Sequence, residues 1–185
     1  MDQPPHRETL LVIQAQQGRV DAFEPLMALC ERGLLYYIRR QVGDINRALD
    51  ISQETWLAVW KSLPGLRSPE SFRPWLYQIA RQRILLDHRR NAKHQRGRKD
   101  EITAEDVPAP EAAVEETIDF NELRRTVDRL CFRWREVIVL RYIAEFSVEE
   151  IALALGCSAG TVKSRLYYAR QELKRLLAGG SEYAP

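Results

Sequence analysis

The chain contains only three cysteines, Cys30, Cys131 and Cys157, and they lie far apart in the sequence. An odd number with no short spacing predicts neither a disulfide framework nor a zinc site. Each cysteine falls on an apolar pattern, so we expect all three to be small buried hydrophobic side chains, with a redox sensor as the alternative. The three histidines likewise lack the spacing of metal ligands. We therefore expect no metal and no cofactor.

Long hydrophobic runs are also missing. No apolar stretch approaches the length that crosses a membrane, and the first eight residues do not have the character of a signal sequence. We expect a cytoplasmic protein without membrane insertion. Paired carboxylates at metal-site spacing, a phosphate-binding glycine loop and a nucleophile–base motif are absent from the sequence as well. These absences predict that the chain is not an enzyme.

Charge is abundant, but it is segregated along the chain. The formal net charge is only +2. Residues 67–100 contain ten Lys or Arg against three Asp or Glu, whereas residues 101–122 contain eight acids and no base. Residues 156–177 are again basic. Two basic blocks around an acidic spacer indicate two contacts with a polyanion.

Helical periodicity covers most of the chain, and strand patterns are weak. In the first half we expect helices over about residues 8–17, 21–43, 45–63 and 72–92. Residues 95–114 lose this periodicity and hold prolines among acids and alanines, which is typical of an extended tether. Four further helices are expected from about residue 116. The predicted fold is all-α, with a helical domain over 1–95, a flexible acidic linker over 96–115, a helix-turn-helix domain over 116–178 and a tail over 179–185.

Local signals predict the helix-turn-helix near the C-terminus. Ser147 and Glu150 have the spacing of a capping box, and Gly156 suits the left-handed residue that ends a helix. Ser158 can cap the second helix, which carries cations and hydroxyl groups on one face. Such a helix fits the major groove of DNA. The candidate contacts are Ser158, Thr161, Lys163, Ser164, Arg165, Tyr168 and Arg170.

The fourth predicted helix places aromatic side chains beside cations. Cations bind phosphates and aromatic faces stack on bases, so the pattern favours DNA whose bases have left the stack. Packing of Trp75 and Tyr77 between helices is the alternative. We expect His88 and His94 at nucleic acid or in solvent, and Asp87 in a local ion pair. The candidate contacts are Arg67, Ser68, Trp75, Tyr77, Arg81, Gln82, Arg89, Arg90 and Lys93.

The third predicted helix has a different polar face. Asp50, Gln53 and Glu54 lie on one side of it, with Trp56 and Trp60 nearby. An acidic and amide face is unsuited to phosphate, so we expect it to contact a protein surface. An ordinary solvated helix face is the alternative.

Three segments, in this order, resemble the bacterial RNA polymerase sigma factors of the extracytoplasmic-function type. Asp50–Lys61 resembles that family's helix for core polymerase, Phe72–Arg90 its −10 melting helix, and Arg135–Leu173 its −35-binding domain. The resemblance extends from about residue 22 to residue 177. The chain departs from the family pattern at Leu49, Gln82, Cys131 and Tyr168.

This resemblance implies a sigma factor that binds core RNA polymerase and directs promoter-specific transcription initiation. The second domain would read duplex −35 DNA. The first domain would capture the melted −10 strand, with a base flipped into a pocket made partly by residues 66–71. An anti-sigma factor is a further expected partner. The residues implied for core polymerase are Asp50, Gln53, Glu54, Trp56 and Trp60.

Two other functions remain open from the residues themselves. A free-standing regulator that binds an operator accounts for the helix-turn-helix, and dimerisation on palindromic DNA would favour it. It does not account for the acidic face of the third helix or for the cations and aromatics of the fourth. A nucleic-acid-processing enzyme would need catalytic or phosphate-binding motifs that the sequence lacks.

Overall fold

The computed structural model of the chain describes residues 4–97 and 120–180, so most of the predicted linker lies outside the described residues. Every element in these two ranges is helical, as predicted. None of the described helices combines the length and the apolar character needed to span a bilayer. The helices of the first range are α1 (Pro4–Gln16), η1 (Val20–Ala22), α2 (Phe23–Val42), α3 (Ile45–Ser62), η2 (Leu63–Gly65), η3 (Pro69–Ser71) and α4 (Phe72–Gly97). Those of the second are α5 (Phe120–Asp128), α6 (Phe132–Tyr142), α7 (Val148–Leu155) and α8 (Ala159–Gly180).

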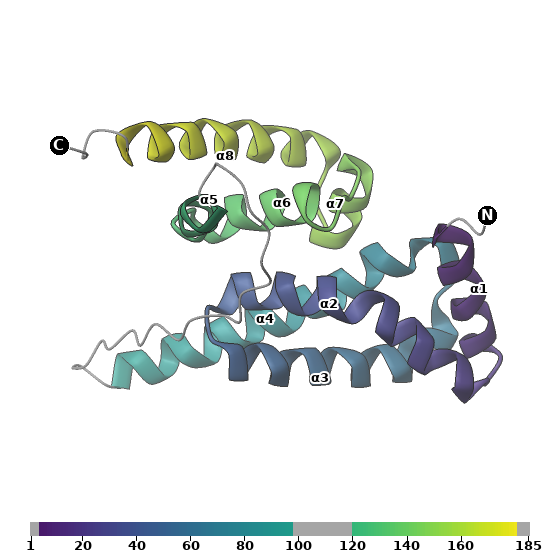
Figure 1. Ribbon diagram of the computed structural model, residues 1–185. Helices are drawn as coiled ribbons and strands as arrows, with labels where there is room; N and C mark the ends of the chain where they lie inside the picture. Colours follow the sequence, from purple (N-terminus) through teal and green to yellow (C-terminus); the bar gives the residue numbers. More distant parts are fainter. Residues whose placement is uncertain (1–3, 98–119, 181–185) are drawn as a thin grey trace.

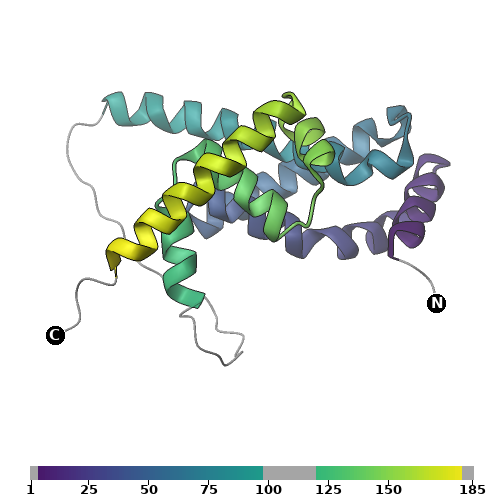
Figure 2. The same ribbon diagram turned by 90° about the horizontal axis from the view of Figure 1, so that it is seen from above.

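The helices stack in layers, and the two domains pack directly on each other. In Figure 1, α3 forms one outer layer, α2 and α4 lie above it, α6 and α7 lie on these two, and α8 is outermost. Viewed from above, α8 runs across the helices beneath it (Figure 2). Helix α1 closes one end of the first domain. The C-terminal end of α4 projects past α2 and α3.

The core of the first domain follows the predicted helical stripes. On α2, buried Leu26, Leu34 and Ile38 recur at helical spacing and face the apolar sides of α3 and α4. Helix α2 ends at Gly43, whose φ of 77° lies in the left-handed region that glycine adopts without strain. Asp44 then caps α3, because its side chain accepts a hydrogen bond from the backbone N–H of Arg47.

Polar contacts fix the three long helices of this domain against one another. On α2, Glu31 accepts hydrogen bonds from the Ser52 hydroxyl, at 3.0 Å, and from the Trp56 indole N–H. Asp87 of α4 forms an ion pair with Arg47 of α3, 40 positions away in the chain. The prediction of a local ion pair for Asp87 was therefore wrong, because the helix that packs beside α4 supplies the cation.

The second domain confirms the predicted helix-turn-helix. The N–H of Glu150 donates to the Ser147 hydroxyl at 3.1 Å, and the N–H of Ser147 donates to the Glu150 carboxylate at 2.8 Å, which completes the capping box. Gly156 ends α7 with φ of 61°. Ser158 caps α8 by accepting a hydrogen bond from the N–H of Thr161 at 3.1 Å. Short-range hydrogen bonds thus define both ends of the turn.

The cysteines do not all occupy the buried sites that were expected. Cys30 is buried in α2, and burial raises the pKa of its thiol to about 12. Cys157 is half-buried. Cys131 is exposed, so the expectation for it was wrong. It occupies the N-cap position of α6, where the backbone has not yet entered the helix and the helical apolar pattern does not yet apply.

Replacing Gly156 with Ala should destabilise the protein by about 1 kcal/mol, because an alanine is strained at positive φ. Gly160→Ala is the matched control. A β-carbon at position 160 makes only ordinary contact with the Ser158 hydroxyl, at 3.7 Å, and alanine favours a helix. Urea unfolding should therefore give a lower free energy of unfolding for Gly156→Ala, and an unchanged or higher one for Gly160→Ala. Equal losses at the two positions would contradict this account.

Candidate functional site

Helix α3 presents a mixed acidic and apolar strip on the outer layer of the first domain. Asp50, Gln53 and Glu54 are all exposed, as predicted from their spacing. Four large apolar side chains are exposed on the same helix, those of Ile45, Leu49, Leu57 and Trp60, with Leu57 at 62% and Trp60 at 45% of their full accessible areas. Exposed apolar side chains beside charged ones are typical of a surface that docks on another protein.

Trp56 does not belong to this exposed strip. It is buried beside Phe23, with the two ring centroids 6.0 Å apart, and its indole N–H is bound to Glu31. Its packing therefore orients α3 against α2 and leaves it little surface for a partner. Trp60, one turn further along, packs edge-on against the same Phe23 ring at 4.8 Å but remains half open to solvent.

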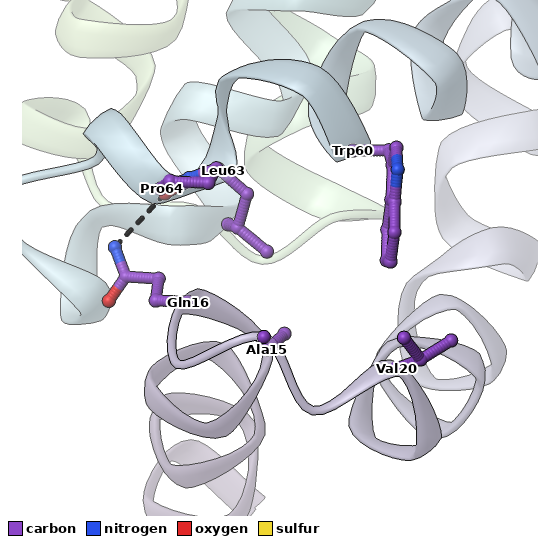
Figure 3. A pocket seen from close by; sticks show the side chains of 7 residues that line it. Ala15, Gln16, Val20, Trp60, Leu63 and Pro64 are labelled. Atoms are coloured by element: carbon purple, nitrogen blue, oxygen red, sulfur yellow. Dashed lines mark hydrogen bonds between the residues drawn. The ribbon is translucent and has the colours of Figure 1, made fainter.

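Beside Trp60 lies a shallow hollow of about 220 Å³ between α1 and the end of α3. Figure 3 shows Trp60 on one side of it and Ala15 and Val20 on the other. Gln16 closes its far end, where the side-chain N–H donates to the carbonyl of Leu63 at 3.0 Å and to that of Leu66 at 2.6 Å. Gln16 thereby ties α1 to the start of the loop that leads into α4.

The predicted −10 contacts lie along this loop and α4, but they are not equally accessible. Arg67, Gln82, Arg89 and Arg90 are exposed, and Ser68 and Trp75 are half-buried. Lys93 belongs to α4, but the structure does not describe its side chain. Most of the cationic positions are therefore open to a polyanion along the outer part of α4.

Tyr77 and Arg81 differ from the others, because the second domain covers them. Tyr77 is only 2% exposed, and its ring lies 4.9 Å from that of Phe146, in the segment before α7. Burial raises the pKa of the Tyr77 hydroxyl. The Arg81 guanidinium donates to the Glu136 carboxylate of α6 at 2.8 Å. While the domains are packed in this way, the Tyr77 ring is not accessible to DNA, and the Arg81 guanidinium, whose side chain keeps 23% of its accessible area, is already paired with Glu136.

His88 also faces the second domain. It is half-buried, and its ring packs edge-on against Phe132 of α6 at 5.3 Å between centroids. It lies neither at an open nucleic-acid surface nor in bulk solvent, so both expectations for its environment were wrong in this arrangement. The side chain of His94 lies outside the described ones.

The predicted −35 contacts lie on the first three turns of α8. Ser158, Lys163, Ser164, Tyr168 and Arg170 are exposed, and Thr161 and Arg165 are half-buried. Two of the hydroxyl groups are engaged within the helix, since Ser158 caps it and the Ser164 hydroxyl donates to the Thr161 carbonyl at 3.0 Å. Lys163 projects from the N-terminal part of α8, from which recognition helices contact base edges. The described residues contain no cluster of side chains suited to a metal ion.

Comparison with known proteins identifies the two domains. The family model for sigma-70 region 2 matches residues 26–94, and that for sigma-70 region 4 matches residues 120–173. RNA polymerase sigma factor NccH from Alcaligenes xylosoxydans xylosoxydans is 34% identical over 178 residues, covering 94% of this chain and 96% of that protein. The chain is a sigma factor of the extracytoplasmic-function type.

Other relatives and solved structures agree with this assignment. RNA polymerase sigma factor CnrH from Cupriavidus metallidurans is 31% identical, covering 97% of this sigma factor and 98% of CnrH. A structure of CnrH with the cytosolic domain of CnrY matches with a TM-score of 0.70 at 26% identity, covering 94% of this chain and 98% of that one. The sigma factor RpoE from Bartonella quintana, bound to the anti-sigma factor NepR, matches with a TM-score of 0.74 at 26% identity, covering 86% and 98%. The sigma factor thus directs promoter-specific transcription initiation through RNA polymerase.

Sequence reasoning missed three residues at these surfaces. Leu57 follows Gln53 by four positions, so its place on the polar face of α3 was visible from helical spacing. Glu136 precedes the apolar run of α6 directly, but its burial depends on Tyr37 and Arg81, which are 99 and 55 positions away and leave no local signal. Gln16 carries no such signal, because both of its partners are backbone carbonyls about 50 positions away.

Gln16→Met should lower the free energy of unfolding by about 1–2 kcal/mol. The substitution keeps the length of the side chain but leaves the Leu63 and Leu66 carbonyls without their donor. Gln17→Met is the control, since Gln17 is exposed and a surface change there should cost less than about 0.5 kcal/mol. Urea unfolding of the two variants compares them directly. Equal stability would show that the contacts of Gln16 do not hold the loop.

Proposed function

We propose that the exposed strip of α3 is the surface with which this sigma factor binds core RNA polymerase. The observation that carries the proposal is the combination of Asp50, Gln53 and Glu54 with the exposed side chains of Leu57 and Trp60 on one helix. Apolar side chains supply the buried centre of such an interface, and the carboxylates select a basic partner. Trp56 supports the surface from below by fixing α3 against α2.

In the same proposal the two domains contact different parts of a promoter. Helix α4 and the loop before it bind the melted −10 strand, with cations on phosphates and half-buried Trp75 available for stacking. Tyr77 could stack on a base only if the two domains separate. Helix α8 reads duplex −35 DNA, with Thr161, Lys163, Ser164 and Arg165 at base edges and Arg170 on phosphate. Each domain offers few contacts alone, so tight binding requires both to be held on polymerase.

Several further properties belong to this proposal. The functional domains extend over residues 1–95 and 116–178, with the acidic linker over 96–115 and the tail over 179–185. The protein catalyses no reaction itself and acts in the cytoplasm. Because CnrH and RpoE form complexes with CnrY and the anti-sigma factor NepR, we also propose that an anti-sigma factor binds this protein.

The polymerase surface is tested by replacing Asp50, Gln53 and Glu54 together with alanine. We expect this variant to lose binding to purified core RNA polymerase in a pull-down, while its helical content and melting temperature stay unchanged because all three side chains are exposed. Leu57→Ser should weaken binding as well, since it removes apolar area from the same surface.

The matched control is Glu24→Ala combined with Glu149→Ala, which removes the same two negative charges from exposed positions elsewhere. It should retain binding. Failure of the folded wild-type protein to bind core polymerase would favour a free-standing DNA-binding regulator. Equal binding by the triple variant and the control would show that core polymerase does not bind through this strip of α3.

Base reading by α8 is tested with polymerase holoenzyme on a promoter library randomised in the upstream element. Lys163→Ala should lose about 1–3 kcal/mol of discrimination at one base pair, because an exposed cation there can bond a base edge. Lys174→Ala, an exposed cation further along α8, should weaken binding about equally for all sequences. An unchanged sequence preference in Lys163→Ala would show that Lys163 does not contact a base edge.

A further inference from the structure

The outward face of α8 carries two neighbouring tyrosines that are open to solvent. Tyr167 and Tyr168 keep 54% and 57% of their accessible areas. Tyr168 is one of the predicted −35 contacts, whereas Tyr167 is not among them. Large aromatic side chains that stay exposed next to one another are typical of a surface that contacts a ligand or a partner.

The two rings form a single surface. Consecutive residues of an α-helix point about 100° apart, so their side chains normally diverge. Here the ring centroids lie only 5.4 Å apart, in an edge-to-face arrangement. Each ring therefore leans toward the other, across the middle of the exposed face. Edge-to-face pairs are favourable, so the rings hold each other in place. We call Tyr167 and Tyr168 the aromatic ridge.

The aromatic ridge continues the line along which the start of α8 faces outward. The opposite side of the helix packs into the domain through three buried residues, Val162, Leu166 and Ala169. Gly160, Ser164 and Tyr167 follow one another at spacings of four and three, so they share the outward line. Gly160 has no side chain and Ser164 has a short one. The first two turns of α8 can therefore approach a groove closely, and the ridge is the first bulky group on this line.

The charges beside the aromatic ridge favour a polyanion as its partner. One edge of the ridge is followed by exposed cations at spacings of seven and four, which are Lys163, Arg170 and Lys174. On the other edge, Glu172 is paired with Arg175 at 2.6 Å, which neutralises its charge. An apolar strip beside a row of cations matches duplex DNA, in which base edges lie in a groove lined by phosphates.

An aromatic ring in the major groove can distinguish thymine from the other bases. Thymine presents a methyl group there, and apolar side chains make contact with it. A tyrosine ring offers such an apolar face, while its hydroxyl at the tip can bond a phosphate or water. Contact between the ring and the methyl group removes apolar area of both from water, which stabilises the complex.

We propose that the aromatic ridge reads a thymine in the upstream promoter element by packing against its methyl group. The proposal rests on the assignment of α8 to −35 DNA and names a base that this helix selects. Lys163 lies four residues before Tyr167, which is about 6 Å along the helix axis. Successive base pairs are about 3.4 Å apart. For a helix that lies along the groove, the thymine is thus about two base pairs from the pair that Lys163 contacts.

The test uses RNA polymerase holoenzyme and promoters that lack single methyl groups. The preferred upstream element is selected from a promoter library randomised in that element. Each thymine on either strand is then replaced singly by deoxyuridine, which differs from it only by the missing methyl group. One replacement should weaken binding of the wild-type holoenzyme about fourfold, the effect of losing one buried methyl group. The other replacements should have little effect.

Variants of the aromatic ridge show whether the rings make this contact. With both tyrosines replaced by alanine, the thymine and deoxyuridine promoters should bind equally well. With both replaced by phenylalanine, the fourfold difference should remain, because the ring and not the hydroxyl contacts the methyl group. Tyr142→Ala is the matched control, since Tyr142 is 52% exposed at the end of α6, and it should keep the difference. All these side chains are exposed, so the substitutions should leave the fold intact.

Three outcomes would overturn the thymine contact alone. They are a selected element in which no thymine responds to deoxyuridine, a fourfold difference that survives in the double alanine variant, and a difference that is lost in the double phenylalanine variant. Absence of any sequence preference in the upstream element would overturn the assignment of α8 to −35 DNA as well. A protein partner would then be the better explanation of the aromatic ridge. The Lys163→Ala measurement separates the two failures, because Lys163 lies outside the ridge.

Discussion

The placement of the two domains depends on the burial of one carboxylate. Moving a carboxylate out of water costs several kcal/mol unless hydrogen bonds and opposite charge replace its hydration. Within the described residues, both hydrogen-bond donors to the Glu136 side chain come from the first domain, Tyr37 from α2 and Arg81 from α4. The second domain therefore carries a group whose burial is tolerated only against this one site. Phe146 and Phe132 add apolar contacts around it, and α7 packs along α4 beside them.

The order of the helical layers explains how the first domain exposes the strip of α3 while its helix α4 is partly covered by the second domain. Helix α3 is an outer layer, held by Glu31 and by the Arg47–Asp87 pair, and its acidic and apolar strip faces away from the second domain. Helix α4 lies next to that domain, which contacts it at Tyr77, Arg81 and His88. Its C-terminal end projects past the bundle. The two functions assigned to the first domain are thus separated by the thickness of a helical layer.

Much of this could be predicted from the sequence because the signals are local. The capping box at Ser147 and the left-handed Gly156 depend on residues at most four positions apart, and the exposed face of α3 follows from helical spacing. Burial of Tyr77 between helices agrees with the alternative given by the sequence. The part played by the second domain in covering Tyr77 and pairing with Arg81 could not be predicted, since it depends on contacts to residues 55 or more positions away. For the same reason, Trp56 was assigned to a surface although its indole belongs to the α2–α3 contact. A helical pattern shows which positions are apolar, but not which neighbour will cover them.

Arg81 and Tyr77 contact the second domain and are also assigned to promoter DNA, and they cannot contact both at once. This restricts which substitutions on α4 can be accepted during evolution. A substitution on α4 alters the fit to the second domain and the fit to a nucleotide at the same time, so selection on one is constrained by the other. A substitution at Asp128, which is partly exposed and pairs with Arg40, alters the fit between the domains without touching α4. Substitutions in the second domain can therefore change the strength of the contact between the domains while the DNA-contacting residues of α4 stay the same.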